Sequence, residues 1–153
     1  MSRSGFSAFE MLIVIVIVGI IATIGFPKIR QGLDKANVRS ARVSIGSFAA
    51  EARAAAIQRG CHAVVHFVGG SSSRAWVTAC PRYKAGAGTV DTVAMIDNVS
   101  GQFNVTLTAT RDSVQYDPRG LSMDNAVTIV RFTGNVASNT DSVLINTMGK
   151  VVR

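Results

Sequence analysis

The stretch "SRSGFSAFEMLIVIVIVGIIATIGFPKIR", residues 2–30, decides the fold, because its residues 11–26 form an apolar run without a charge. Ser4 to Pro27 is 24 residues long and carries a single charge, Glu10. As a helix this segment would be about 36 Å long, at ~1.5 Å per residue, which is enough to cross a bilayer. A carboxylate beside such a run is unexpected, because an ionised group near hydrocarbon costs at least a few kcal/mol. The sequence therefore predicts a membrane helix in which Glu10 has a specific role.

Almost all of the charge of the chain lies after Pro27. Among 153 residues there are 16 Lys and Arg and 9 Asp and Glu, which gives a net charge of +7 and a pI near 10.3. Arg3 and Glu10 are the only charges before Lys28, so residues 28–153 hold 15 of the bases and 8 of the acids. A chain of this length suits one domain with a modest core. Its basic balance favours anionic partners, such as nucleic acid or anionic lipid, without choosing between them.

Two interpretations of the N-terminus explain only part of it. A secretory signal peptide has a basic start, which Arg3 provides, but also a small-residue cleavage site. Here the apolar run is followed by Phe26-Pro27-Lys28 instead. A simple transmembrane anchor explains the length of the run and leaves Glu10 unexplained.

A third interpretation rests on residues 5–14, "GFSAFEMLIV". This segment resembles the processing site of type IV pilins and type II secretion pseudopilins, which has Gly, then Phe, then a Glu four residues later, then about twenty apolar residues. The resemblance implies that a prepilin peptidase cuts between Gly5 and Phe6 and methylates the new amine of Phe6. Pro27 also falls where the family commonly has a proline that loosens the helix. We expect localisation in a bacterial inner membrane, with a periplasmic soluble domain, before transfer to a pilus or pseudopilus.

The resemblance also gives Glu10 a role in assembly. It implies that the Glu10 carboxylate pairs with the amine of Phe6, in the same chain or in a neighbour already in the filament. A buried charge needs such a partner, so a misplaced subunit would leave Glu10 unpaired in a dry environment. The alternative is a glutamate that merely reaches the lipid headgroups.

Beyond Pro27 the spacing of apolar residues predicts that the helix resumes. Arg39, Arg42 and Arg53 fall largely on the side of the helix opposite these apolar residues. Gly60 is predicted to end the helix. Gly25, Pro27 and Gly32 mark a weak stretch between the two halves. The apolar residues that recur at steps of three and four are Val38, Ala41, Ile45, Phe48, Ala49, Ala52 and Ala56. We therefore divide the chain into a leader (1–5), a transmembrane assembly helix (6–27), an amphipathic helix (28–60) and a β domain (61–153).

Residues after Gly60 alternate as β-strands do. Residues 61–68 and 74–80 are predicted to form a hairpin around the Gly-Ser loop at 69–73. A hairpin centred on this loop pairs residues whose numbers sum to 141, so Val65 would face Trp76 and Cys61 would face Cys80. Opposed residues are close enough to bridge after a small adjustment. We expect a disulfide between the only two cysteines, the alternative being two buried free thiols.

The remaining pattern predicts an α+β fold, the pilin fold, in which an antiparallel sheet packs on the long N-terminal helix. Asp117 to Gly120 is predicted to be a turn, Thr147 to Gly149 a tight connection, and Pro81 to Asp91 a mobile loop. The further strands are predicted at residues 103–110, 114–116, 126–132, 142–146 and 150–152.

Later segments narrow the resemblance to the GspH/FimT group of minor pilins and pseudopilins. They are residues 49–59, "AAEARAAAIQR", the Trp76 hairpin, "VQYDPRG" at 114–120 and "VLINTMGKVVR" at 143–153. The resemblance implies a minor type IV pilin that takes part in pilus assembly at the filament tip. A minor pseudopilin of type II secretion that binds no DNA is the alternative. The implied partners are other pilins or pseudopilins, the prepilin peptidase and the inner membrane.

Some members of this group bind double-stranded DNA for uptake through a C-terminal Gly-Arg-x-Arg motif. Here Gly149 and Lys150 match the motif's first two positions, but Val152 takes the place of the second Arg and Arg153 comes one residue late. The candidate DNA contacts are therefore Lys150 and Arg153, with Arg82 and Lys84 in the loop as additional ones.

No set of residues predicts catalysis, a metal site or a cofactor. His62 and His66 could chelate an ion on a helix, but on a strand they lie about 13 Å apart, too far for one ion. We expect a structural or binding protein and not an enzyme.

Overall fold

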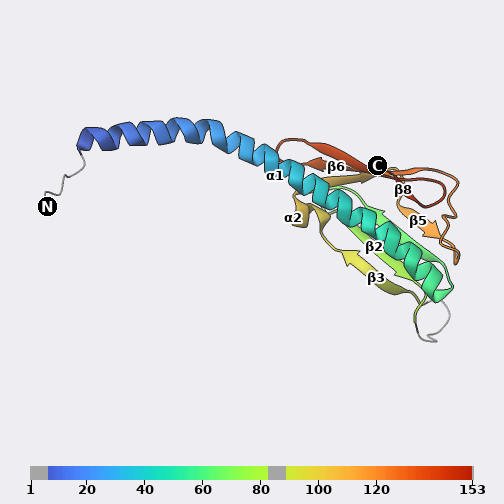
Figure 1. Cartoon of the computed structure of the whole chain (residues 1–153). Helices are drawn as coiled ribbons and strands as arrows, with labels where there is room; N and C mark the ends of the chain where they lie inside the picture. The colour runs from blue at the N-terminus through green and yellow to red at the C-terminus, as the bar shows by residue number, and fades with distance from the viewer. Residues whose placement is uncertain (1–6, 83–88, 153) are drawn as a thin grey trace.

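A computed structural model describes residues 7–82 and 89–152, and its main element is one very long helix (Figure 1). Helix α1 (Ala8–Arg59) has 52 residues. Ser7 caps its start by accepting a hydrogen bond from the Phe9 N–H, and Gly60, in the left-handed conformation, ends it. Pro27 lies inside α1 without ending it, and the helix curves between its two halves. The first half projects beyond the rest of the molecule, whereas the second half lies on the β domain (Figure 1).

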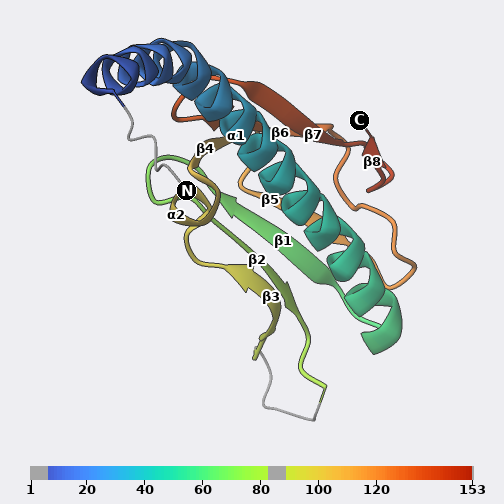
Figure 2. The same cartoon turned by 60° about the vertical axis from the view of Figure 1, so that its left-hand side comes forward.

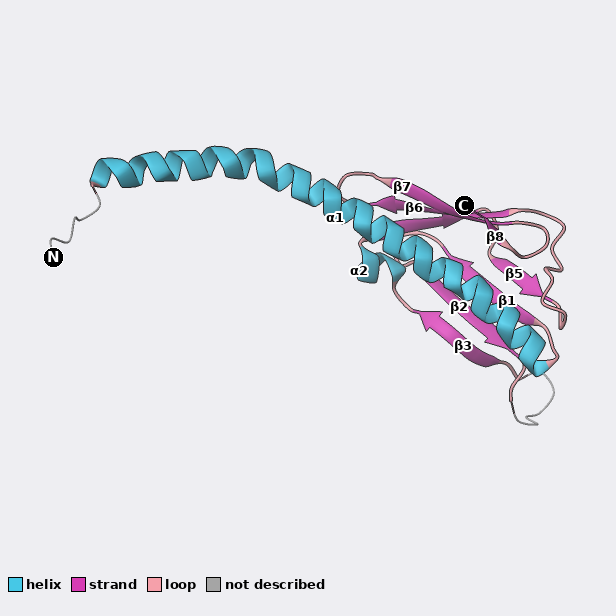
Figure 3. Ribbon diagram, viewed as in Figure 1, coloured by secondary structure: helices cyan, strands magenta, loops and turns pink. Residues whose placement is uncertain are grey.

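The strands form two antiparallel sheets, where the sequence predicted one (Figure 3). The first sheet, ordered β3-β2-β1-β5, contains β1 (Ala63–Val68), β2 (Arg74–Ala79), β3 (Asp91–Ile96) and β5 (Ser113–Tyr116). The second, ordered β4-β6-β7-β8, contains β4 (Val105–Ala109), β6 (Thr128–Gly134), β7 (Thr140–Ile145) and β8 (Val151–Val152). A short helix, α2 (Val99–Phe103), precedes β4.

The core lies between α1 and both sheets (Figure 2). The buried face of α1 carries the apolar residues that the sequence predicted, and Ala55 is buried with them. The strands contribute every second residue to the core, as expected when alternate side chains of a pleated strand point to one face. The largest fully buried side chains are Tyr116, Phe132, Ile45, Leu107 and Ile145. The α+β architecture is therefore confirmed.

The register of the β1–β2 hairpin differs by one residue from the prediction. Val65 pairs with Val77 and not with Trp76, because paired residue numbers sum to 142. Directly opposed residues share a face of the sheet, and Val65 is buried whereas Trp76 is partly exposed, so the predicted pair would have mixed the two faces. Trp76 instead pairs with His66 on the outer face, where the two rings stack with centroids 4.8 Å apart.

The disulfide is present although its predicted strand pairing is wrong. Cys61 and Cys80 lie just outside β1 and β2, and their Cα atoms are 6.2 Å apart. Beyond the ends of the ladder the chain is free to deviate from strict pairing, which allows the bridge to form. The predicted loop at Pro81–Asp91 lies partly outside the described residues, and its last residue begins β3.

Candidate assembly and processing site

Glu10 lies in the first turn of α1, three residues after the cap Ser7. Its backbone N–H donates to the Ser7 carbonyl (3.1 Å), and its side chain is exposed. The partial positive charge at a helix N-terminus favours a carboxylate here, independently of any other partner. The predicted cleavage residues Gly5 and Phe6 lie outside the described residues.

We call residues 8–27 of α1 the membrane half, after its composition. It is apolar on all sides except at Glu10, and none of its residues is buried within the described chain. Its most apolar stretch of 18 residues has a mean hydropathy of 2.7, and none of it is buried. Large side chains such as Ile15, Ile21 and Phe26 are 63–69% exposed. 

A helix that is hydrophobic all round and unpacked needs an apolar environment, so this half is suited to a bilayer or to a bundle of similar helices.

The soluble half of α1 carries a second regular stripe, which we call the exposed stripe. All of its residues are solvent-exposed and uncharged, and they recur at alternating steps of four and three. This is the heptad spacing by which one helix packs along another. The exposed stripe lies about 160° around the helix from the buried face, at ~100° per residue. Its members are Ile29, Leu33, Ala36, Ser40, Val43, Ser47, Ala50, Ala54 and Ile57.

Sequence reasoning missed the exposed stripe, although the signal was present. The exposed stripe has the same three- and four-residue steps as the buried face, in another phase. Both stripes lack lysine and arginine, whereas Lys28, Lys35 and Arg39 lie between them. The helix therefore has one face for its own domain and another that is available to a second helix.

Asp34 fixes the start of the soluble half to the β domain. Its side chain is 1% exposed, and its carboxylate accepts hydrogen bonds from the Val136 N–H (3.1 Å), the Asn139 N–H (3.2 Å) and the Asn139 Nδ2 (2.8 Å). These donors belong to the β6–β7 turn, residues 135–139. Gly134 lies so close that any Cβ there would overlap the carboxylate. The turn is therefore held on α1 by one carboxylate, which we call the Asp34 clamp.

Burial alone would raise the pKa of Asp34, but the hydrogen bonds outweigh it. The side chain of Asn139 and the backbone N–H groups of Val136, Asn139 and Ala137 hold the pKa below its ordinary value. Asp34 is consequently ionised at neutral pH. Sequence reasoning missed this residue. The sign of its role was that an acidic residue stands on the same helix face as the buried apolar residues Val38 and Ala41.

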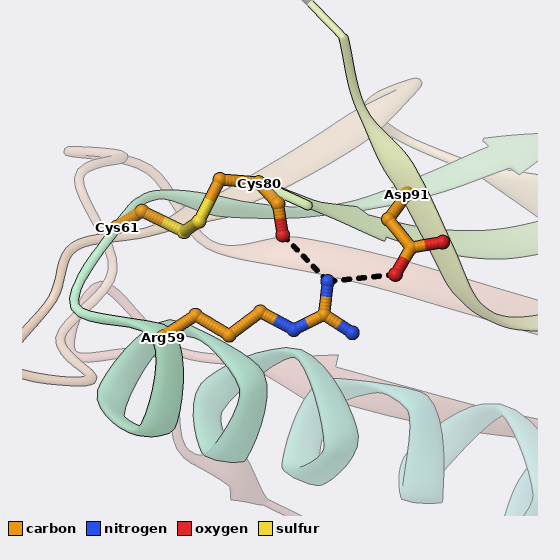
Figure 4. A network of polar contacts seen from close by, with 4 residues as sticks. All are labelled: Arg59, Cys61, Cys80 and Asp91. Carbon is orange, nitrogen blue, oxygen red and sulfur yellow. Dashed lines mark hydrogen bonds and ion pairs between the residues drawn. A yellow bond between two sulfur atoms is a disulfide. The ribbon is translucent and has the colours of Figure 1, made fainter. Parts of the chain in front are cut away.

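At its other end α1 is fastened by the disulfide and by Arg59 (Figure 4). The Arg59 guanidinium donates to the Cys80 carbonyl and lies 3.0 Å from the Asp91 carboxylate. A cation in the last turn is also favoured by the negative end of the helix dipole. The end of the helix is thereby joined to β2 and to the start of β3.

The predicted DNA contacts do not gather on one surface among the described residues. Arg82 is exposed and follows β2 in the first sheet, whereas Lys150 is exposed and precedes β8 at the edge of the second. Lys84 and Arg153 lie outside the described residues. The side chain of Asn146 accepts hydrogen bonds from the Met148 and Lys150 N–H groups, which confirms the predicted tight connection before Lys150.

Comparison with known proteins supports the fold. No family model matches the sequence, and no curated protein matches it. Two crystal structures of the type IV minor pilin FimU from Pseudomonas aeruginosa (strain PAO1) are similar, each with 10% sequence identity. One gives a TM-score of 0.55 over 74% of this chain and 90% of FimU, and the other gives 0.57 over 77% and 88%. The likeness shows that this chain has the fold of a type IV pilin.

Proposed function

We propose that this chain is a minor type IV pilin, cleaved by prepilin peptidase between Gly5 and Phe6 and built into a pilus near its tip. The observation that carries the proposal is the uncovered apolar half of α1 on a domain with the fold of the minor pilin FimU. Such a helix holds the subunit in the inner membrane before assembly. In this proposal the chain is a structural subunit and not an enzyme.

The two halves of α1 supply the contacts for assembly. The membrane half packs among the apolar helices of neighbouring subunits, and Glu10 sets its position by pairing with the amine of Phe6. The exposed stripe extends the same packing surface along the soluble half, from Ile29 to Ile57, because it is uncharged and has heptad spacing.

We expect Glu10→Ala to enter filaments poorly while it is still cleaved and inserted. Removing the charge makes membrane insertion easier, so the loss should appear only at assembly. The measurement is the ratio of variant to wild-type chain in sheared pili, with both co-expressed in a host that assembles type IV pili. Mass spectrometry of the membrane fraction in the same cells should show chains that begin at a methylated Phe6.

Glu51→Ala is the matched control, since Glu51 is exposed on the soluble half of the same helix. It should enter pili as wild type does. Equal incorporation of Glu10→Ala and Glu51→Ala would show that Glu10 only contacts the headgroups. A mature chain that still begins at Met1 would contradict processing altogether.

The alternative is a minor pseudopilin of type II secretion, which has the same helix and the same processing. The FimU structures favour the pilus, because FimU is described as a type IV minor pilin. Deleting the gene for this chain separates the two: loss of surface pili supports the proposal, whereas loss of protein secretion with normal pili supports the alternative.

We also propose, as a second function, that the C-terminal turn contacts double-stranded DNA. The observation in its favour is that Lys150 is exposed and its turn is held in place by Asn146. Binding should be nearly independent of sequence and fall steeply with salt. Lys150→Gln should lower the slope of log affinity against log salt by about 1. A titration of the full chain in detergent with fluorescent duplex measures this, and Lys35→Gln is the control. No binding at low salt would exclude the second function.

A further inference from the structure

The β6–β7 turn reaches back along α1 to the level of the apolar run. Val136 and Ala137 of the turn face residues 22–31 of the helix across an open groove of about 580 Å³. The helix side of the groove includes Phe26, Pro27 and Arg30. Val136 and Phe26 are 53% and 63% exposed, so the groove has uncovered apolar side chains on both of its walls.

The Asp34 clamp fixes this arrangement. Its carboxylate holds the turn at both ends, through the N–H of Val136 and both donors of Asn139. Because Asp34 lies only seven residues after Pro27, the depth of Val136 is tied to the depth of Phe26. The turn cannot move along the helix without breaking three hydrogen bonds to a buried carboxylate.

The part of α1 from its start at Ala8 to Phe26 is only just long enough to cross a membrane, which places Phe26 at the edge of the hydrocarbon. Ala8 to Phe26 is about 28 Å long at ~1.5 Å per residue, against a hydrocarbon core of roughly 30 Å. If Phe26 moved out into water, the other end of the helix would be drawn into the bilayer, and both changes cost free energy. Val136 opposite it must then lie at the level of the lipid headgroups.

Cations at the level of the groove complement an anionic surface, although only Arg30 among them lines the groove itself. Lys28, Arg30 and Lys35 are exposed and have no acidic partner within the described part of the chain. Asp34 is the acid nearest to them in the sequence, and its oxygens are already occupied by the turn. Cations at a membrane boundary attract anionic lipid headgroups, and an apolar side chain beside them gains by entering the interface.

We propose that the β6–β7 turn and residues 26–35 of α1 form a membrane-docking surface for anionic phospholipid. Val136 enters the headgroup layer, and the three cations bind headgroup phosphates. The proposal rests on the membrane insertion of α1 stated above. Docking holds the domain in one orientation on the bilayer before assembly, and the subunit leaves this surface when it enters the filament.

The test uses the full chain in bilayers, with one cysteine introduced for an environment-sensitive fluorophore. Val136→Cys is compared with Met123→Cys, because Met123 is equally exposed and lies near Gly120, which packs beside Arg53 and Ile57 far along the helix. Cys61 and Cys80 are bridged, so they do not react with the label. Lipids with a nitroxide near the headgroup should quench the fluorophore at 136 and not at 123.

Bilayers with phosphatidylglycerol should dock the turn more strongly than bilayers of phosphatidylcholine alone. Each of Lys28→Gln, Arg30→Gln and Lys35→Gln should lower the ratio of docked to undocked chain about fivefold in the anionic bilayer, from ~1 kcal/mol per base. Arg131→Gln, on the outer face of the second sheet, should leave the ratio unchanged. Equal quenching at 136 and 123 in chains that are inserted would overturn the docking proposal alone. Chains that alkali extracts from the bilayer would instead overturn the membrane insertion on which it rests.

Discussion

Replacing Asp34 by Ala should lower the free energy of unfolding of the β domain by about 3 kcal/mol. The substitution leaves the Val136 and Asn139 donors without an acceptor in a buried site, and each unsatisfied buried donor costs roughly 1–3 kcal/mol. The side chain of Asn139 can turn toward solvent, because Asn139 is partly exposed, so the total stays near the lower end of that sum. The measurement is urea unfolding of the full chain in detergent, followed by the fluorescence of Trp76.

Asp112→Ala is the matched control, because Asp112 is an exposed carboxylate that accepts no side-chain hydrogen bond within the described residues. It removes the same charge and should change stability by less than about 0.5 kcal/mol. Asp34→Asn keeps the shape of the side chain but places an amide N–H group opposite the donors of the turn. Its stability should therefore be little better than that of Asp34→Ala. A loss equal to that of the control would show that the turn is held by packing and not by the carboxylate.

The same clamp should make the domain sensitive to acid. The pKa of Asp34 is lower in the folded chain than its ordinary value of 3.8, so the unfolded chain binds a proton first as the pH falls. The contribution of Asp34 is therefore complete above its ordinary pKa and is lost as the pH falls through the lower folded value. The difference in stability between wild type and Asp34→Asn should shrink below about pH 4, whereas it should be constant between pH 6 and 8.

The features that the sequence predicted correctly depend on neighbours along the chain. The long helix follows from the run at residues 11–26 and from the steps between Val38 and Ala56, and Gly60 ends it as expected. The turn at Asp117 is also local, since its carboxylate accepts from the Arg119 and Leu121 N–H groups. Such patterns can be predicted from the sequence because each residue's partner lies within a few positions.

The features that were missed depend on partners far along the chain. The sequence did not predict β3, because its residues do not alternate between buried and exposed and a bulge opposite Val77 and Thr78 interrupts its pairing with β2. The division into two sheets was not visible either, because β4 and β5 are consecutive and yet belong to different sheets. Asp34 takes its donors from residues more than 100 positions away, so one sequence gives no sign of the clamp beyond its phase. The register of the β1–β2 hairpin is likewise set by which residues of both strands are buried, and not by the centre of the loop.

Loss of the disulfide should be comparably damaging to the domain, at the other end of the helix. Cys61 and Cys80 are 19 positions apart, and closing a loop of about that size is worth roughly 3 kcal/mol in the chain-entropy model. The bridge also fixes the ends of β1 and β2 beside Arg59, so the Arg59 contacts with Cys80 and Asp91 should weaken with it. We therefore expect a double Cys61→Ser, Cys80→Ser variant to unfold at a much lower urea concentration than wild type.

Arg59→Gln separates the covalent bridge from the polar contacts that lie next to it. It removes the ion pair with Asp91 and the hydrogen bond to the Cys80 carbonyl, leaves the disulfide intact, and should cost about 2 kcal/mol. If the entropy of the unfolded chain is the main term, reduction of Arg59→Gln should cost as much as reduction of wild type. A smaller loss in Arg59→Gln would mean that the bridge acts by positioning Arg59. Two thiols that react with iodoacetamide in folded protein from the periplasm would contradict the disulfide itself, because a bridged pair has no free thiol to alkylate.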